Sequence, residues 1–153
     1  MTMRHLVYVY REKQHLGHPE SRALVLKAVN AALREENVAQ ACSVGVTFTD
    51  DEGIHAVNLE NRGIDAPTDV LSFPINEPDY DNNTLYLGDM VLSLERAERQ
   101  GEEYGGGYGH ELQYLAVHSV LHMLGYDHLD EGPQKAAMRE REKIIMKRLG
   151  YEF

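Results

Sequence analysis

The chain has 153 residues, 42% hydrophobic and 26% charged, which is ordinary for a globular protein with its own hydrophobic core. It contains no run of roughly 20 apolar residues, so a membrane-spanning helix is not expected, and the polar start does not resemble a secretory signal. Cys42 is the single cysteine, which excludes an intrachain disulfide and fits a reducing cytoplasm. The formal net charge of −10 argues against a broad phosphate-binding surface, so an RNA-binding protein of this composition must gather its basic groups locally.

The first third of the chain predicts two strands and two helices in alternation. Residues 4–10 and 42–49 are rich in β-branched and aromatic residues, which is typical of strands. Between them, residues 19–36 begin with proline and continue with apolar positions at a helical period, so they predict a helix. Residues 50–61 predict a short helix with an aspartate cap.

The middle of the chain predicts two further strands and a helix. Residues 65–74 form a turn that leads into a strand, and Pro74 either closes this strand or places it at a sheet edge. The segment 76–83 is polar and predicts a loop. Residues 85–92 predict the next strand, and a helix capped by a serine follows over 93–103.

Two helices are expected in the last third. A glycine-rich hinge, 105–109, precedes a helix over 110–124, and a last amphipathic helix opens at Gly132 and Pro133. We expect the apolar face of that last helix to contain Ala136, Ala137, Ile144, Ile145 and Leu149. The charged stretch 139–143 predicts a solvated helix face. Together these elements predict an α+β fold, a small mixed β-sheet packed with several helices in a single domain over residues 1–153.

Three histidines within eleven residues have the spacing of a metal site: His118, His122 and His128. Residues four apart on a helix project from one face, and a glycine at 125 can end the helix and return the chain toward that face. Three neutral imidazoles suit Zn²⁺ and leave one coordination position open, which is typical of catalytic rather than structural sites. A histidine pair at this spacing also arises by chance, and the third histidine favours the metal-binding interpretation. The metal cleft would then be formed by this helix and the turn after it.

Three segments resemble the signature of the YbeY-type endoribonucleases, the bacterial ribosomal RNA maturation factors. They are the histidine motif over 117–128, the segment 58–74 with its Ala-Pro-Thr-Asp-Val-Leu-Ser-Phe-Pro core, and Leu-Gly-Asp-Met-Val-Leu-Ser over 87–93. Order and spacing agree from about residue 40 to the end. Asn61 departs from this pattern, because the family often has tyrosine there.

The resemblance implies a zinc-dependent endoribonuclease directed at single-stranded RNA, acting in small-subunit ribosomal RNA maturation and ribosome quality control. It implies RNA and the small ribosomal subunit or its proteins as partners, a cytoplasmic location, and neither DNA nor membrane binding. It also implies that His118, His122 and His128 are the Zn²⁺ ligands and that Arg62 is the functional arginine.

This residue set suggests a mechanism for phosphodiester cleavage. A dication held by neutral imidazoles lowers the pKa of a bound water toward about 7, and the water so activated would attack the phosphodiester. Arg62 is the catalytic candidate, because a guanidinium matches phosphate geometry and stabilises charge that develops on its oxygens. Asp127 could orient a ligand imidazole, and Asp89 could brace the site from its strand; purely structural roles are equally consistent with both.

Alternatives differ in where the general base lies and in whether catalysis occurs at all. Zinc peptidases carry a glutamate base directly after the first histidine, and Ser119 stands there in this chain. The activated water could therefore act unaided, the base could come from elsewhere, or the 2′-hydroxyl of RNA could take part. A non-catalytic ribosome-assembly factor with structural zinc is the main alternative function, and a metallopeptidase is the less favoured one.

Overall fold

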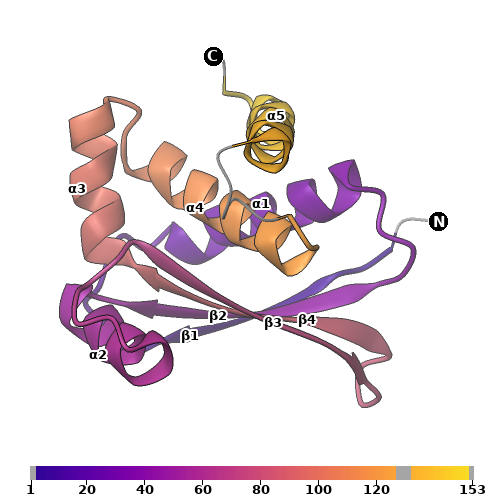
Figure 1. The fold of residues 1–153 in the computed structure, drawn as a ribbon, viewed down its shortest axis with the longest axis horizontal. Helices are drawn as coiled ribbons and strands as arrows, with labels where there is room; N and C mark the ends of the chain where they lie inside the picture. The colour runs from indigo at the N-terminus through magenta and orange to yellow at the C-terminus, as the bar shows by residue number, and fades with distance from the viewer. Residues whose placement is uncertain (1–2, 127–131, 152–153) are drawn as a thin grey trace.

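The structure is a computed structural model that describes residues 3–126 and 132–151. Figure 1 shows the elements in this part of the chain: β1 (Leu6–Arg11), α1 (Ser21–Glu35), β2 (Cys42–Thr49), α2 (Asp51–Arg62), β3 (Val70–Asp79), β4 (Thr84–Ser93), α3 (Leu94–Tyr104), α4 (Tyr108–Met123) and α5 (Pro133–Arg148). Within these described residues, no helix combines the length and the apolar character needed to cross a membrane.

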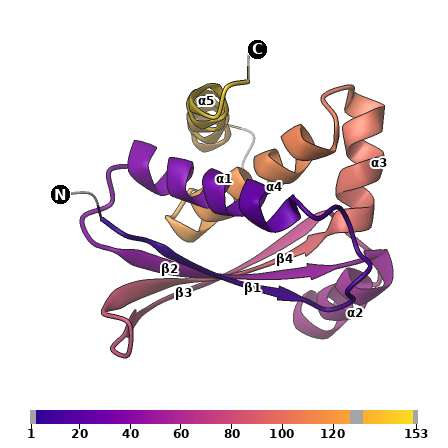
Figure 2. The ribbon, with the colours of Figure 1, turned by 180° about the vertical axis from the view of Figure 1, so that it is seen from behind.

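The four strands form one mixed sheet in the order β1-β2-β4-β3. β1, β2 and β4 are parallel, and β3 pairs with β4 in the antiparallel sense at the edge. α1 and α4 lie across one face of the sheet, α5 lies outside them, and α2 covers one end of the opposite face (Figures 1 and 2). The predicted α+β class is confirmed. β1, α1 and β2 form a parallel crossover unit that the sequence did not predict.

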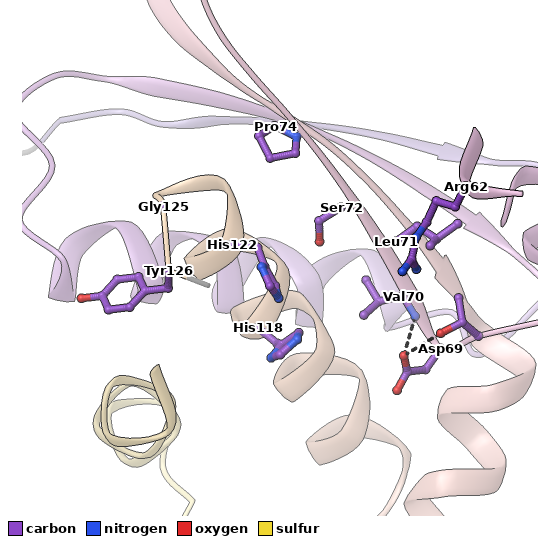
Figure 3. Close-up of a pocket in the computed structure, with 11 residues that line it drawn as sticks. Arg62, Asp69, Val70, Leu71, Ser72, Pro74, His118, His122, Gly125 and Tyr126 are labelled. Atoms are coloured by element: carbon purple, nitrogen blue, oxygen red, sulfur yellow. Dashed lines mark hydrogen bonds between the residues drawn. The ribbon is translucent and has the colours of Figure 1, made fainter. Parts of the chain in front are cut away.

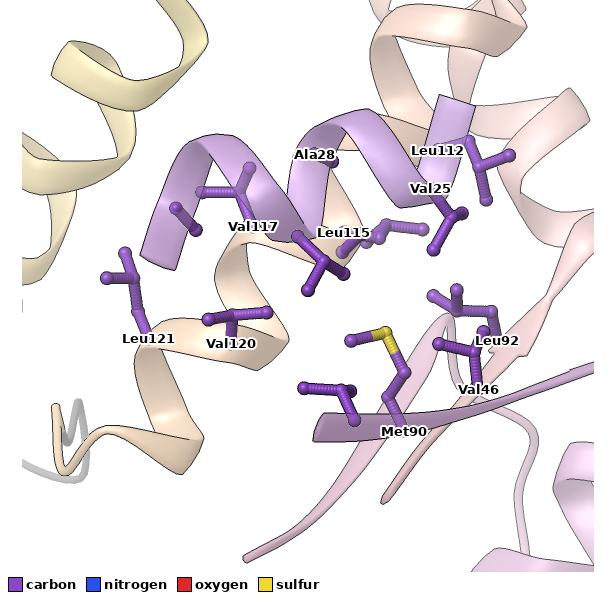
Figure 4. Packing of buried hydrophobic residues seen from close by; sticks show 14 of the residues in the cluster. Val25, Ala28, Val46, Met90, Leu92, Leu112, Leu115, Val117, Val120 and Leu121 are labelled. Carbon is purple, nitrogen blue, oxygen red and sulfur yellow. The ribbon is translucent and has the colours of Figure 1, made fainter. Parts of the chain in front are cut away.

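α4 is the central helix of the molecule, because it is apolar on nearly every side. Its residues Leu115 and Val120 are almost completely buried between α1 and the sheet, where they meet side chains such as Met90 of β4 (Figure 4). β2 supplies every second residue to the same core, with Val44, Val46 and Phe48 on the helix side. The helix that carries the histidine motif is therefore anchored in the core by its buried residues.

β3 is longer than the sequence predicts. It continues through Pro74 to Asp79, with a register shift against β4 between Pro74 and Glu77, so the predicted loop over 76–83 is reduced to the turn at 80–83. Proline is tolerated here because β3 is an edge strand and its outer N–H positions have no partner strand to satisfy. Pairing with β4 thus extends a segment whose polarity favours a loop.

The predicted apolar face of α5 is confirmed only in its second half. Ile145 is buried and Leu149 packs against the core, whereas Ala136 and Ala137 are exposed. The buried residues of the helix are Met138, Glu142, Ile145 and Met146. Arg141 of the charged stretch is also engaged, since its guanidinium donates to the carboxylate of Glu36 at the end of α1. The stretch 139–143 is therefore partly an interface rather than a solvated face.

Candidate metal centre

His118 and His122 lie on one face of α4, as their spacing predicts. Their ring centroids are 4.8 Å apart and the ring planes meet at 78° (Figure 3). The helix ends at Met123, and Gly125 follows with a φ of 105°, a left-handed conformation that favours glycine. The predicted helix end at this glycine is confirmed. His128 and Asp127 lie outside the described residues.

Both imidazoles line a cavity of about 550 Å³ between α4 and the edge strand β3. Arg62, the last residue of α2, lines the same cavity, so the structure brings together the arginine and two of the histidines that the sequence singled out. Figure 3 shows Arg62 of α2 and the two histidines of α4 around the cavity, with Tyr126 at one end. The remaining lining residues are Thr68, Asp69, Val70, Leu71, Ser72, Pro74 and Gly125.

Arg62 owes its place to the end of α2 and the loop after it. Gly63 takes a left-handed conformation with a φ of 70° and turns the chain off the helix directly after the arginine. The amide of Asn58, a buried residue of α2, donates to the carbonyl of Ala66 at 2.9 Å and holds the loop against the helix. Arg62 itself is exposed toward the cavity side, where an anionic substrate can reach it.

Asp69 orders the turn before β3. Its Oδ1 accepts a hydrogen bond from the backbone N–H of Val70 at 2.8 Å, and the amide of Gln100 approaches its Oδ2 at 3.5 Å. Figure 3 shows the first of these contacts as a dashed line beside the cavity. Asp69 thus combines a structural role with a position on the cavity wall.

His118 is fixed from its far side by a carboxylate of α5. Its Nδ1 lies 2.6 Å from Oε2 of Glu142, and the hydroxyl of Tyr114 donates to Oε1 of the same carboxylate at 3.1 Å. With Nδ1 donating to Glu142, Nε2 is the ring nitrogen that would bind a metal. For Asp127 the sequence was equally consistent with an orienting and with a purely structural role, and it singled out no other carboxylate for orienting a ligand histidine. Sequence reasoning missed Glu142, because it stands in a charged stretch that resembles a solvated helix face.

Ser119, in the position of the peptidase glutamate, is completely buried and does not line the cavity. Its hydroxyl lies 2.6 Å from that of Ser72 on β3. Ser119 therefore joins α4 to the edge strand and is not placed to act as a base.

Glu111 is a second buried acid that the sequence analysis did not identify. Only 5% of it is exposed, and burial, followed by the nearby charge of Asp69, raises the pKa of its carboxyl to about 7. It precedes His118 by seven residues and His122 by eleven, so all three project from one stripe of α4. The sequence feature that could have identified Glu111 is a glutamate seven residues before His118 on a largely apolar helix.

The suggestion that Asp89 braces the site is wrong. Along β2, Val44 and Val46 face the helices, so Gly45 between them faces the opposite side of the sheet. Asp89 lies over Gly45 and accepts a hydrogen bond from the hydroxyl of Tyr86, so it is on the sheet face away from α4.

The donor set fits a borderline divalent cation such as Zn²⁺. Two imidazoles converge at a cavity wall, and one has its second nitrogen occupied by a carboxylate, which is the usual arrangement around ligand histidines. The described residues contain no group of three or more histidine, cysteine, aspartate or glutamate side chains able to hold a metal. The third predicted ligand, His128, lies outside them.

Comparison with known proteins relates the chain to one family over nearly its full length. The model of the family described as "Endoribonuclease YbeY" matches residues 7–150. The Endoribonuclease YbeY of Clostridium kluyveri is 45% identical over 143 residues, 82% of this chain and 87% of the relative. That of Caldanaerobacter subterraneus is 47% identical over 138 residues, 84% of this chain and 87% of the relative.

Two further matches cover more of the chain. The Endoribonuclease YbeY of Chloroflexus aurantiacus is 42% identical over 151 residues, which cover 95% of this chain and 97% of the relative. A solution structure of a Thermotoga maritima protein has the same fold, with a TM-score of 0.63, 23% identity, and coverage of 94% of this chain and 88% of that one. The resemblance expected from the motifs is confirmed, and the chain belongs to the Endoribonuclease YbeY family.

Proposed function

We propose that this protein is a zinc-dependent endoribonuclease that cleaves single-stranded regions of ribosomal RNA during maturation of the small subunit. The observation that carries the proposal is that Arg62, His118 and His122 line the same cavity. The relatives are endoribonucleases by name, which supports cleavage of RNA at internal phosphodiester bonds. The whole chain, residues 1–153, would act as one domain in the cytoplasm, with the small subunit or its proteins as partners.

The metal would be held by His118 and His122, with His128 as the third ligand. When bound by three neutral imidazoles, Zn²⁺ lowers the pKa of a coordinated water toward about 7 and polarises a phosphate oxygen. The protein's own contribution is to fix the two imidazoles on a buried helix, because a ligand on a rigid element keeps its geometry through the reaction.

Arg62 would bind the scissile phosphate and stabilise the charge that accumulates on its oxygens in the transition state. Two further cations, Lys135 and Arg139, line a smaller cavity beside His118 together with Glu142. Arg62 and these two side chains would contribute the local positive charge that a chain with a net charge of −10 needs to approach RNA.

A metallopeptidase is disfavoured by the surroundings of Ser119. Peptide hydrolysis depends on a proton carrier beside the metal, and the side chain in that position is buried against Ser72. Three alternatives for the proton transfer stay open: the activated water acts unaided, the base comes from elsewhere, or the 2′-hydroxyl of RNA takes part.

Cleavage of a fluorescent single-stranded RNA, measured together with the zinc content of the purified protein, tests the proposal. We expect His118→Ala and His122→Ala to lose both zinc and cleavage, and Arg62→Ala to keep zinc but lose cleavage. The exposed His15→Ala serves as the matched control and should resemble the wild type in both. Undiminished cleavage after complete chelation would overturn the metal-dependent mechanism. Full rescue of ribosome maturation by a folded His118→Ala variant would favour the assembly-factor alternative.

A further inference from the structure

We propose that Glu142 is a positioning residue of the metal centre, which holds His118 with Nδ1 turned toward α5 and Nε2 toward the bound ion. The inference rests on the proposed function, because it assumes that His118 is a ligand. Its basis is the 2.6 Å contact between the imidazole Nδ1 and the carboxylate Oε2.

The burial and the hydrogen-bond partners of Glu142 support a positioning role for its carboxylate. Its side chain is only 6% exposed, in the stripe of α5 that also buries Met138 and Ile145. A buried carboxylate is costly unless its oxygens are hydrogen-bonded, and an apolar residue here would extend the core without that cost. The two oxygens of Glu142 instead meet two donors, Tyr114 and His118.

Each of the two donors lies against a different oxygen of the Glu142 carboxylate. The hydroxyl of Tyr114 donates to Oε1 at 3.1 Å, which leaves Oε2 for the imidazole. Tyr114 precedes His118 by four residues on α4, so both side chains project toward α5 from the same face. The rings of Tyr114 and His118 lie 6.1 Å apart at a shallow angle of 31°. The carboxylate is thus held by one residue of α4 and orients another.

This contact selects one form of the histidine. A carboxylate accepts hydrogen bonds, so the proton of neutral His118 is kept on Nδ1, and Nε2 retains the lone pair that a metal requires. Removing such an orienting partner in other proteins weakens metal binding by about 10- to 100-fold. α5 follows His128 in the chain, so the helix beyond the motif would support a ligand that precedes it.

The test measures the zinc dissociation constant by competition with a chromophoric chelator, which needs no RNA and no turnover. Glu142→Met removes the acceptor while keeping an unbranched side chain of similar length beside Met138 and Met146. We expect it to weaken zinc binding by about 10- to 100-fold. Glu142→Gln keeps an oxygen acceptor and should bind zinc more tightly than Glu142→Met. Glu140→Gln, an exposed position on the same helix, is the control and should bind as the wild type does.

The outcomes separate this inference from the proposed function. If His118→Ala loses zinc binding but Glu142→Met binds zinc as tightly as the wild type, the role of Glu142 is overturned and the metal site stands. If His118→Ala and His122→Ala both retain wild-type affinity, the metal site itself is overturned. Should Glu142→Met fail to fold, ¹⁵N NMR of the metal-free wild type decides the matter. We expect neutral His118 to carry its proton on Nδ1, and a proton on Nε2 overturns the inference.

Discussion

The hydroxyl of Ser72 on β3 lies 2.6 Å from the hydroxyl of Ser119 on α4, and this contact joins the two walls of the cavity. The two serines are not equivalent. Ser119 is completely buried, whereas Ser72 lines the cavity and is partly exposed to it. Water can therefore replace a lost partner for one hydroxyl but not for the other.

This asymmetry predicts unequal effects of two alanine substitutions. Ser72→Ala leaves the Ser119 hydroxyl buried without its partner and should lower the free energy of unfolding by about 1–3 kcal/mol. Ser119→Ala should cost less, because Ser72 can turn to solvent in the cavity. Urea titrations of both variants and of the double variant measure the difference. Equal losses, or a larger loss for Ser119→Ala, would contradict the assignment.

Arg62 should matter for the chemical step rather than for the fold. It is exposed at the end of α2, so Arg62→Ala should unfold at the wild-type temperature. Loss of one preorganised group that stabilises transition-state charge lowers kcat by roughly 100- to 1,000-fold. Arg62→Lys should recover part of this loss, because it keeps the charge without the two-pronged geometry. Arg22→Ala, an exposed arginine of α1, is the control in the same RNA cleavage assay, and an equal loss there would refute the role of Arg62.

Glu111 should make stability depend on pH. Its pKa is raised from 4.5 to about 7 in the folded protein, so the buried acid contributes stability below pH 4.5 that is lost as the pH rises through 7. Glu111→Gln stays neutral at every pH. Above pH 7 it should be more stable than the wild type, by up to about 3 kcal/mol, and the difference should shrink toward pH 5. Thermal unfolding from pH 5 to pH 8 measures this, with the exposed Glu140→Gln as control. A gain independent of pH would exclude titration of Glu111 as its cause.

Glu36 ties three elements together at the end of α1. Its Oε1 accepts from the hydroxyl of Tyr126 and its Oε2 from the guanidinium of Arg141, each at 2.6 Å, and its side chain is 8% exposed. Glu36→Ala should lower the free energy of unfolding by at least about 2 kcal/mol, because hydrogen bonds to buried charges are strong. Its neighbour Glu35 offers a matched control.

Glu35 pairs with Arg148 at 3.4 Å, and that arginine side chain is 73% exposed. Exposed ion pairs contribute about 1 kcal/mol or less, so Glu35→Ala should have a small effect. Chemical denaturation of both variants checks the pair. Similar losses for Glu35→Ala and Glu36→Ala would show that burial of the carboxylate does not decide its contribution.

The sequence predicted the parts of the site that depend on local spacing. A step of four residues places His118 and His122 on one helix face, and Gly125 ends that helix, as found. Local spacing could not place Arg62, which is 56 positions before His118. It lines the same cavity because the sheet and the loop before β3 bring the end of α2 close to α4. The resemblance to a family supplied that residue.

Glu142 and the extended β3 were missed for a common reason, namely that distant partners determine them. Glu142 is buried because Tyr114 and His118, which belong to another helix, satisfy its oxygens. Residues 76–79 form a strand because β4 offers them a paired edge, although their polarity favours a loop. Burial of Glu142 and strand pairing of residues 76–79 both depend on three-dimensional neighbours, although residues 76–78 remain exposed as their polarity suggests.

α4 is both the centre of the core and a wall of the cavity. These two roles together limit the insertions and deletions that the helix can accept. One residue inserted before His118 would turn every later side chain of the helix by roughly 100°. The imidazoles would leave the cavity at the same moment as Val120 and Leu121 left the interior. Length variation is therefore forbidden within this helix and tolerable only beyond its ends, as at the hairpin turn 80–83.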